Sequence, residues 1–225
     1  MKTLELRDYA PPVFASQSVH SLFPTPIWIH TLRPEDADPL NQAIATEVAQ
    51  LEQLRGPLRP GGMFQSQGDL VERPPYNRLR PFIESATAGA MKFLSAAEAT
   101  AQITSMWLNV STRMTAHRSH SHPNNFLSGV YYAQVDERSN VLTLEDPRPQ
   151  ANVLRPHYLA PTEYNSGVTH LRVEPGWLVL FPAFLSHSVP PSDSERLRIT
   201  VAFNIMLADF ASDYAPIAWK GNVTA

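Results

Sequence analysis

Apolar residues recur at helical spacing in two stretches of the first hundred residues. The stretches run from about Pro34 to Leu54 and from about Tyr76 to Ala97. Steps of three and four residues place apolar side chains on one side of a helix. The residues concerned are Leu40, Ala43, Ile44, Val48 and Leu51, then Leu79, Phe82, Ile83, Ala86, Ala90, Phe93 and Leu94. The pattern predicts two amphipathic helices laid against a sheet.

From about Ile103 the pattern changes to short segments rich in β-branched and aromatic residues. Pro, Asn, Asp and Gly stand between these segments, as expected for strands joined by turns. The segments are ITSMWLNVST, FLSGVYYAQV, NVLTLED, HLRVEPGWLVLFP and LRITVAFNIML. Successive strands without intervening helices favour a sandwich or jelly roll over βαβ units. The chain is therefore predicted to be mainly β, with flanking N-terminal helices.

The length of 225 residues and the 43% hydrophobic content fit one domain with a sizeable core. Within residues 1–225 we expect helical support over 34–98 and a jelly-roll core over 103–207. The connection RGPLRPGGMFQSQGDLVERPP joins the two predicted helices. It is rich in turn residues and is either a lid or substrate rim or a plain surface loop.

Charge and cysteine content narrow the classes of partner. The net charge is −3 and the basic residues are scattered, which argues against nucleic acid and against a polybasic membrane anchor. A small-molecule or peptide substrate fits better. The chain has no cysteine, so a metal would need nitrogen or oxygen ligands. MKTLELRDYAPPVF lacks the apolar run of a signal peptide and no segment has transmembrane length, so a cytoplasmic location is expected.

Histidines cluster in the stretch HRSHSHP, which holds His117, His120 and His122. In extended backbone His120 and His122 project from one face and His117 from the other. A distant His187 is followed nine positions later by Arg196. Strands far apart in sequence meet at the mouth of a jelly roll, so these histidines predict a metal site with an anion-binding arginine beside it.

Other candidate residues have ordinary structural explanations. Single histidines are usually surface or satisfied core residues, and we expect this of His20, His30, His157 and His170. His117 is expected to support the ligands from behind or to face solvent. Trp107 shares a strand face with Asn109 and is expected in the core. Arg148 either holds a substrate carboxylate or forms a surface ion pair.

Several blocks, in this order, carry a family resemblance: FPTPIW at 23–28, WLNV at 107–110, HSHP with LSGVYY within 120–132, EDPR at 145–148, and GWLVLFPAFLSHSVPPSDSERLRITVAFN at 176–204. Together they resemble the bacterial family of iron(II)- and 2-oxoglutarate-dependent oxygenases over residues 23–207. That family is similar to the prolyl hydroxylase branch of its superfamily. The resemblance implies a cupin-like double-stranded β-helix as the core.

The resemblance also implies an activity and its cofactors. Members use iron(II), O2 and 2-oxoglutarate as co-substrate, and they release succinate and CO2 while oxidising an unactivated C–H bond. Hydroxylation of a small molecule, an amino acid or a peptide is the generic expectation; desaturation or ring formation would use the same ligands. Exposed strand edges in such barrels commonly pair, so a homodimer is compatible with the sequence.

Site residues follow position by position from the resemblance. His120 takes the place of the first histidine of the family's H-x-D motif and His187 that of the distal histidine. Arg196 matches the arginine that receives the distal carboxylate of 2-oxoglutarate, and Tyr132 resembles the tyrosine that assists it. A guanidinium and a phenol hydroxyl suit a carboxylate. Thr200 is expected near the same pocket, and Arg198 stays an alternative to Arg196.

The sequence departs from the family pattern at position 122, where a carboxylate is usual and this chain has His122. No Asp or Glu occurs from Asn109 through Val135. Three interpretations remain: a three-histidine iron site, a carboxylate supplied by Glu145 or Asp146, or an altered and weakened site. We prefer three histidines, because H-x-H spacing reaches one metal directly and imidazole is an acceptable ligand for iron(II).

The predicted function is therefore that of an iron(II)- and 2-oxoglutarate-dependent dioxygenase. One alternative is a three-histidine cupin-type dioxygenase, which consumes O2 without using 2-oxoglutarate or releasing succinate. The other is a non-catalytic metal-binding or ligand-binding barrel, in which the lost carboxylate has abolished turnover.

Overall fold

The computed structural model describes residues 14–96 and 100–208. Its helices are α1 (Pro34–Arg55) and α2 (Arg80–Phe93), with short 3-10 turns at Leu70–Glu72, Tyr76–Leu79 and Pro149–Asn152. The strands are β1 (Trp28–Thr31), β2 (Met63–Gln65), β3 (Ala101–Ser111), β4 (His117–His120), β5 (Leu127–Gln134), β6 (Val141–Glu145), β7 (Val168–Arg172), β8 (Trp177–Pro182), β9 (His187–Val189) and β10 (Arg198–Leu207).

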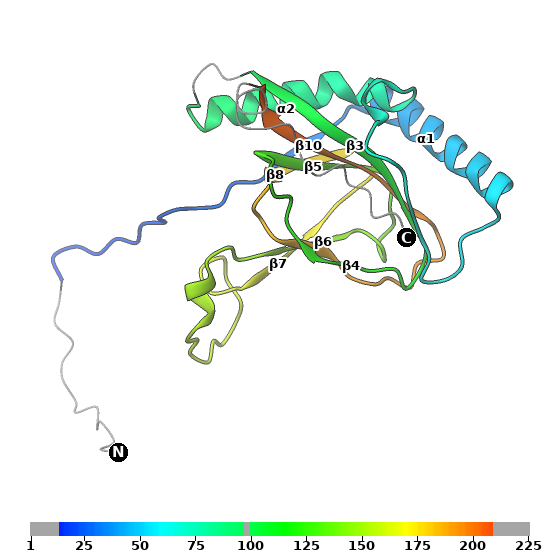
Figure 1. Cartoon of the computed structure of the whole chain (residues 1–225). Helices are drawn as coiled ribbons and strands as arrows, with labels where there is room; N and C mark the ends of the chain where they lie inside the picture. The colour runs from blue at the N-terminus through cyan, green and yellow to red at the C-terminus, as the bar shows by residue number, and fades with distance from the viewer. Residues whose placement is uncertain (1–13, 97–99, 209–225) are drawn as a thin grey trace.

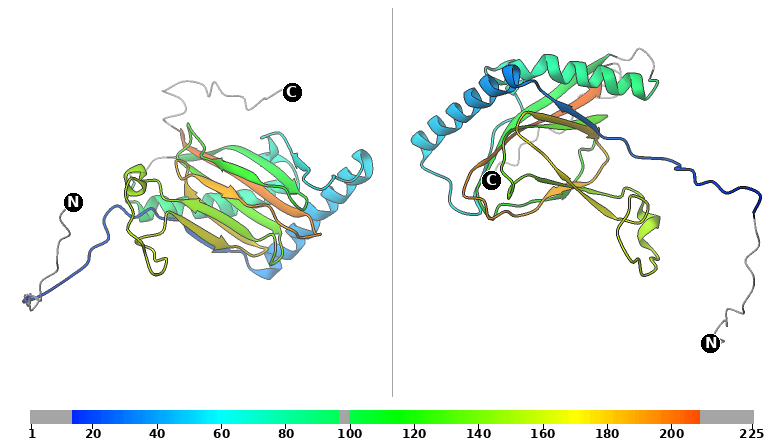
Figure 2. Two further views of the ribbon diagram at one scale, coloured as in Figure 1. Left: turned by 90° about the horizontal axis from the view of Figure 1, so that it is seen from below. Right: turned by 180° about the vertical axis from the view of Figure 1, so that it is seen from behind.

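The strands form two sheets that face each other (Figure 1). The larger sheet has the order β1-β8-β5-β10-β3-β2 and the smaller sheet the order β4-β9-β6-β7. Every pairing between these strands is antiparallel. The two helices cover the outer face of the larger sheet, and the smaller sheet lies against its other face (Figure 2). The mainly β, jelly-roll prediction is confirmed.

Alternation along the strands of the larger sheet separates two hydrophobic layers. In β10, Ile199, Val201 and Phe203 belong to the layer beneath the helices, together with Tyr131 of β5. The next residue, Tyr132, belongs to the layer between the sheets, which also holds Phe181 of β8 and Leu144 of β6. Because side chains alternate, Arg198, Thr200, Ala202 and Asn204 of β10 face the space between the sheets. Three of these four side chains are polar, so this face of β10 can line a binding site.

The helices follow the predicted pattern closely. The first begins at Pro34 as expected, with Leu40, Ile44 and Val48 buried against the sheet. The second is shorter than its apolar pattern, because Tyr76–Leu79 forms a 3-10 turn and the helix ends at Phe93. The predicted end at Ala97 lies outside the described residues. In the described ranges, neither helix combines the length and the hydrophobicity needed to cross a membrane.

Two connections differ from the sequence prediction. The apolar segment HLRVEPGWLVLFP forms two strands of different sheets, separated by a turn in which Gly176 has a φ of 85°. A side chain is strained in that conformation. The connection after α1 contains β2, which pairs with β3, and its Leu70 is buried, so this segment forms an edge of the larger sheet.

Candidate metal centre

Three histidines, two from the smaller sheet and one from the segment that follows β4, come together in the space between the sheets. His120 ends β4 and lies opposite His187, the first residue of β9. His122 follows two residues later, and its backbone N–H donates to Ala183 O at 2.8 Å. One ring nitrogen from each histidine lies within 4.8 Å of the others. Their ring centroids are 4.4 Å apart for His120 and His187, and 5.1 Å apart for each of these with His122.

Backbone carbonyls orient two of these rings. Nδ1 of His120 lies 2.7 Å from Arg118 O, and Nδ1 of His187 lies 2.9 Å from Leu185 O. A carbonyl oxygen only accepts, so each Nδ1 carries the proton and donates it. Nε2 of each ring is then a lone-pair donor, the arrangement found in metal-binding histidines.

Burial favours the neutral form of two of the three imidazoles, those of His122 and His187. Burial lowers the pKa of His122 to about 3, and neighbouring His187 and His120 act in the same direction. Burial likewise lowers the pKa of His187 to about 4, although its hydrogen bond to Leu185 opposes the shift. These two neutral imidazoles offer free lone pairs, and together with His120 they make up a group of nitrogen donors suited to iron, zinc, copper or nickel.

The carboxylates considered as alternative third ligands do not join this cluster. Among the described residues, His120, His122 and His187 are the only group of three or more possible ligands that are close enough to share an ion. Asp146 accepts hydrogen bonds from Arg148 with both carboxylate oxygens. The negative charge of Glu145 is near enough to raise the pKa of His187, but Glu145 lies outside the group. The geometry favours the three-histidine interpretation.

The arginine that faces the inside of the barrel is Arg198, and the assignment of Arg196 needs correction. Arg196 lies before β10 and is exposed, whereas Arg198 begins the strand and is 7% exposed. Ser194 Oγ accepts from the backbone N–H of Arg196 in the turn that precedes the strand. Alternation would place Arg196 and Arg198 on the same face only if both belonged to β10. The strand begins at Arg198, so Arg196 lies outside it.

Arg198 is a buried cation without a carboxylate partner in the part of the chain that the structure describes. Its Nε donates to Ser139 O at 3.1 Å, and its guanidinium carbon lies 5.5 Å from the centre of the Tyr132 ring. Burial lowers the pKa of the guanidinium, which still stays charged because an arginine pKa is so high. A buried charge of this kind is costly unless an anion joins it.

Polar groups without partners surround this guanidinium. Among the described residues, the buried Tyr132 hydroxyl and Asn109 Oδ1 have no hydrogen-bond partner of regular geometry, although the Tyr132 hydroxyl is close enough to Arg198 for the guanidinium to oppose the rise in its pKa. Burial raises the pKa of Tyr132 to about 12, so its phenol keeps the proton and can donate it. Thr200, 2% exposed, lies opposite both Asn109 and Tyr132 on the neighbouring strands. The structure thus brings Tyr132 and Thr200 together with Arg198, and these donors fit an anionic ligand.

His117 also faces the inside of the barrel, contrary to the prediction from strand alternation. The register of β4 against β9 shifts between His117 and His120. This irregularity places His117 opposite Val189, which lies two residues after His187 and shares its face. Nε2 of His117 lies 3.2 Å from Ser111 Oγ on β3 of the other sheet. His117 is therefore a site-facing residue that sequence alternation could not identify, whereas Ser111 continues the alternation of Trp107 and Asn109 along β3.

The remaining candidates lie elsewhere or have ordinary partners. Trp107 is half-buried, with its ring centroid 5.9 Å from that of His122, so it borders the histidine cluster. Arg148 pairs with Asp146, as a surface arginine would. The other histidines do not join the cluster: His20 lies near Ser18, His30 is partly buried with Nε2 unpartnered, His157 is exposed, and His170 lies near Thr143.

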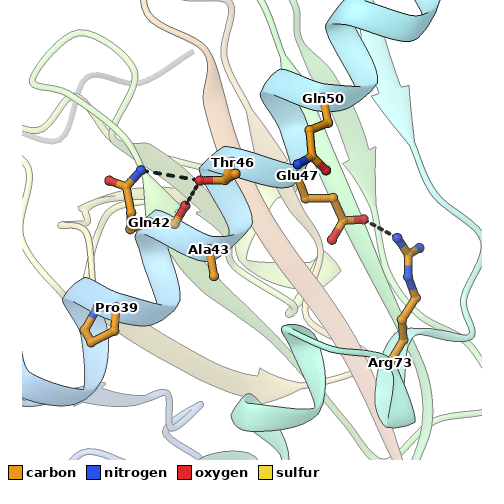
Figure 3. Close-up of a pocket in the computed structure, with 7 residues that line it drawn as sticks. All are labelled: Pro39, Gln42, Ala43, Thr46, Glu47, Gln50 and Arg73. Atoms are coloured by element: carbon orange, nitrogen blue, oxygen red, sulfur yellow. Dashed lines mark hydrogen bonds and ion pairs between the residues drawn. The ribbon is translucent and has the colours of Figure 1, made fainter.

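A groove of about 640 Å³ lies along the outer side of α1 and is separate from the histidines (Figure 3). Its lining residues all come from α1 except Arg73, whose guanidinium reaches Glu47. None of them belongs to a strand of either sheet. The groove contains none of the three clustered histidines.

Comparisons with known proteins agree with this geometry. A family model described as "Putative 2OG-Fe(II) oxygenase" matches residues 105–204, the segment that holds all three clustered histidines and Arg198. No curated protein sequence matches the chain.

Solved structures with the same fold include several such oxygenases. HygX from Streptomyces hygroscopicus, solved with nickel and 2-oxoglutarate, aligns with a TM-score of 0.56 and 10% identity over 82% of this chain and 83% of its own. A Trichoplax adhaerens prolyl hydroxylase in complex with a hypoxia inducible factor peptide aligns with a TM-score of 0.53 and 11% identity over 84% and 87%. A Pseudomonas putida prolyl-4-hydroxylase aligns with a TM-score of 0.51 and 15% identity over 81% and 93%. These likenesses support the double-stranded β-helix.

Proposed function

We propose that this chain, whose residues 105–204 match the family model described as "Putative 2OG-Fe(II) oxygenase", is an enzyme of that family and hydroxylates a C–H bond of a small molecule, an amino acid or a peptide. The balanced reaction consumes the C–H substrate, 2-oxoglutarate and O2 and yields alcohol, succinate and CO2. One oxygen atom of O2 enters the alcohol and the other enters succinate. The cofactor is iron(II), and 2-oxoglutarate is the co-substrate.

One observation carries this proposal: three imidazoles lie close enough to share a metal ion, and they face the buried Arg198, which has no carboxylate partner among the described residues. Under the proposal His120, His122 and His187 hold the iron. When bound, iron(II) supplies the redox chemistry that activates O2 and couples it to 2-oxo acid decarboxylation. A site of three imidazoles is one charge more positive than the usual two histidines and one carboxylate, which favours binding of a dianion.

The chain's own residues bind and orient the co-substrate. Arg198 receives the distal carboxylate of 2-oxoglutarate with its terminal N–H groups, because its Nε is already engaged by Ser139. The Tyr132 hydroxyl donates a further hydrogen bond, and Thr200 lies beside it. The apolar layer around Phe181 and Leu144 excludes water from this end of the pocket, which strengthens the charge pairing.

Anaerobic titration of the iron(II)-loaded protein with 2-oxoglutarate tests the proposal. A chelated 2-oxo acid gives a weak visible charge-transfer band, and its appearance would justify screening substrates by succinate release. If protein shown to hold iron gives no band, the co-substrate assignment fails. Oxygen uptake without succinate would then indicate the three-histidine cupin-type dioxygenase, and no oxygen uptake the non-catalytic barrel.

A further inference from the structure

We propose that His117, supported by Ser111, is a co-substrate-binding residue that hydrogen-bonds the carboxylate held by Arg198. The inference rests on the proposed function, because the carboxylate in question is the distal one of 2-oxoglutarate. It adds to the site a fourth histidine, which binds the organic ligand and not the metal.

The position of His117 follows from the strand registers of both sheets. Ser111 lies opposite Arg198 on the adjacent strand, so both side chains face the space between the sheets. The imidazole of His117 reaches across from the smaller sheet to Ser111 Oγ at 3.2 Å. This contact holds His117 beside Arg198. The side chain of His117 is half-buried.

The groups around His117 are positively charged or neutral, so the surroundings favour binding of an anion. Burial lowers its pKa to about 4, and positive charge on Arg198, His120 and His187 acts in the same direction. No carboxylate contributes to that shift. A neutral imidazole next to a buried cation is costly to maintain for packing alone, since an apolar side chain of similar volume would avoid the desolvation. A bound carboxylate would accept hydrogen bonds from both the His117 imidazole and the Arg198 guanidinium.

The hydrogen-bonding capacity of His117 leaves one nitrogen for a ligand. Among described residues its only hydrogen-bond partner is Ser111, through Nε2. If the Ser111 hydroxyl donates to Nε2, the neutral ring carries its proton on Nδ1 and can donate it to a carboxylate oxygen. His117 lies outside the group of three histidines that could share an ion, so a metal-ligand role is not what the geometry supports.

The test measures 2-oxoglutarate affinity by calorimetry on zinc-loaded protein, which binds the co-substrate without turning over. His117→Phe removes both ring nitrogens, and Ser111→Ala removes their support. His117→Asn retains a side-chain donor. His170→Phe is the matched control, because His170 is also on the smaller sheet but contacts Thr143 and not the cluster.

We expect His117→Phe to raise the Kd for 2-oxoglutarate about tenfold or more, as for a lost hydrogen bond to a charged group. His117→Asn should recover part of this loss, Ser111→Ala should show a smaller one, and zinc affinity should be unchanged in all variants. The Kd for 2-oxovalerate, which has the 2-oxo acid but a methyl group in place of the distal carboxylate, should not respond to His117→Phe.

The outcomes separate the inference from the proposed function. If the wild-type protein binds zinc but not 2-oxoglutarate, the proposed function fails and the inference fails with it. If the wild type binds 2-oxoglutarate and folded His117→Phe and His117→Asn bind it equally well, only the inference is overturned. Loss of zinc from both variants would overturn it as well, by making His117 a metal ligand. Equal losses for 2-oxoglutarate and 2-oxovalerate would refute contact with the distal carboxylate.

Discussion

Replacement of Arg198 by methionine should separate co-substrate binding from folding stability. Methionine is unbranched and flexible, so it can fill much of the space of the arginine stem without its charge. In the protein without ligand Arg198 is 7% exposed, its Nε donates to Ser139 O, and its guanidinium lies close to the Tyr132 hydroxyl. The substitution removes that bond and also removes the need to bury a charge.

The two contributions to stability have opposite signs. The lost hydrogen bond to a charged donor costs about 1.5–3 kcal/mol. Relief from burying an ion without a carboxylate partner returns several kcal/mol by order of magnitude. The free energy of unfolding of the ligand-free Arg198→Met protein should therefore equal or exceed that of the wild type, which is unusual for a substitution at a buried position.

The effect on co-substrate binding should be large. Truncating one partner of a buried charge pair costs about 2–5 kcal/mol, so the Kd for 2-oxoglutarate should rise roughly 30- to 5,000-fold. Urea unfolding with and without 2-oxoglutarate measures both quantities on zinc-loaded protein. At a ligand concentration of about 100 times the wild-type Kd, the wild type should gain about 2.7 kcal/mol and the variant about 0.9 kcal/mol or less.

Arg196→Met is the matched control, because Arg196 is exposed and precedes the same strand. It should change neither the unfolding free energy nor the co-substrate affinity beyond the small effects of a surface substitution. Our reasoning is refuted if Arg196→Met loses 2-oxoglutarate affinity while Arg198→Met retains it. A ligand-free Arg198→Met protein that is several kcal/mol less stable would refute the argument about the unpaired charge.

Further predictions concern the metal ligands and the packing of the larger sheet. His120→Ala and His187→Ala should each abolish iron(II) binding, measured by metal analysis after gel filtration; stoichiometric iron in both would remove these residues from the ligand set. His122→Asp should tighten iron(II) binding and weaken binding of dianionic 2-oxoglutarate, because it adds a negative charge to the metal site; unchanged affinities for both would show that position 122 is not a ligand. Gly129→Ala should destabilise the fold by about 1–3 kcal/mol in urea unfolding, since the added Cβ would lie 2.3 Å from Phe203 Cζ, and an unchanged midpoint would contradict that account of the packing.

Much of the fold was predictable because it follows from local pattern. Helical spacing located α1 and most of α2, and β-branched and aromatic runs located β3, β5, β6, β8 and β10. The short strands β1, β2, β4 and β9 have three or four residues each, too few for alternation to stand out. Each of them pairs with a strand far away in the sequence, and a local pattern does not reveal such a partner.

The sequence predicts which side chains lie together when the residues are close along one extended segment. It does not predict this when the answer depends on where a strand begins or on its register. The H-x-H spacing correctly grouped His120 and His122, and strand pairing adds His187. The choice between Arg196 and Arg198 depends on the residue at which β10 begins. The orientation of His117 depends on a register shift in β4. Both features arise from pairing with distant strands. A single domain, a cytoplasmic location and a homodimer stay predictions.

The division of the site between two sheets has a consequence for cooperative unfolding. Short strands of the smaller sheet supply His120 and His187, and His122 follows β4, whereas long strands of the larger sheet supply Arg198, Tyr132 and Thr200. In the ligand-free protein the smaller sheet should open as a separate unit at lower free energy, with faster amide hydrogen exchange in β4 and β9 than in β10. Metal and 2-oxoglutarate bound together would join the sheets, so both strands should approach the exchange protection of the larger sheet.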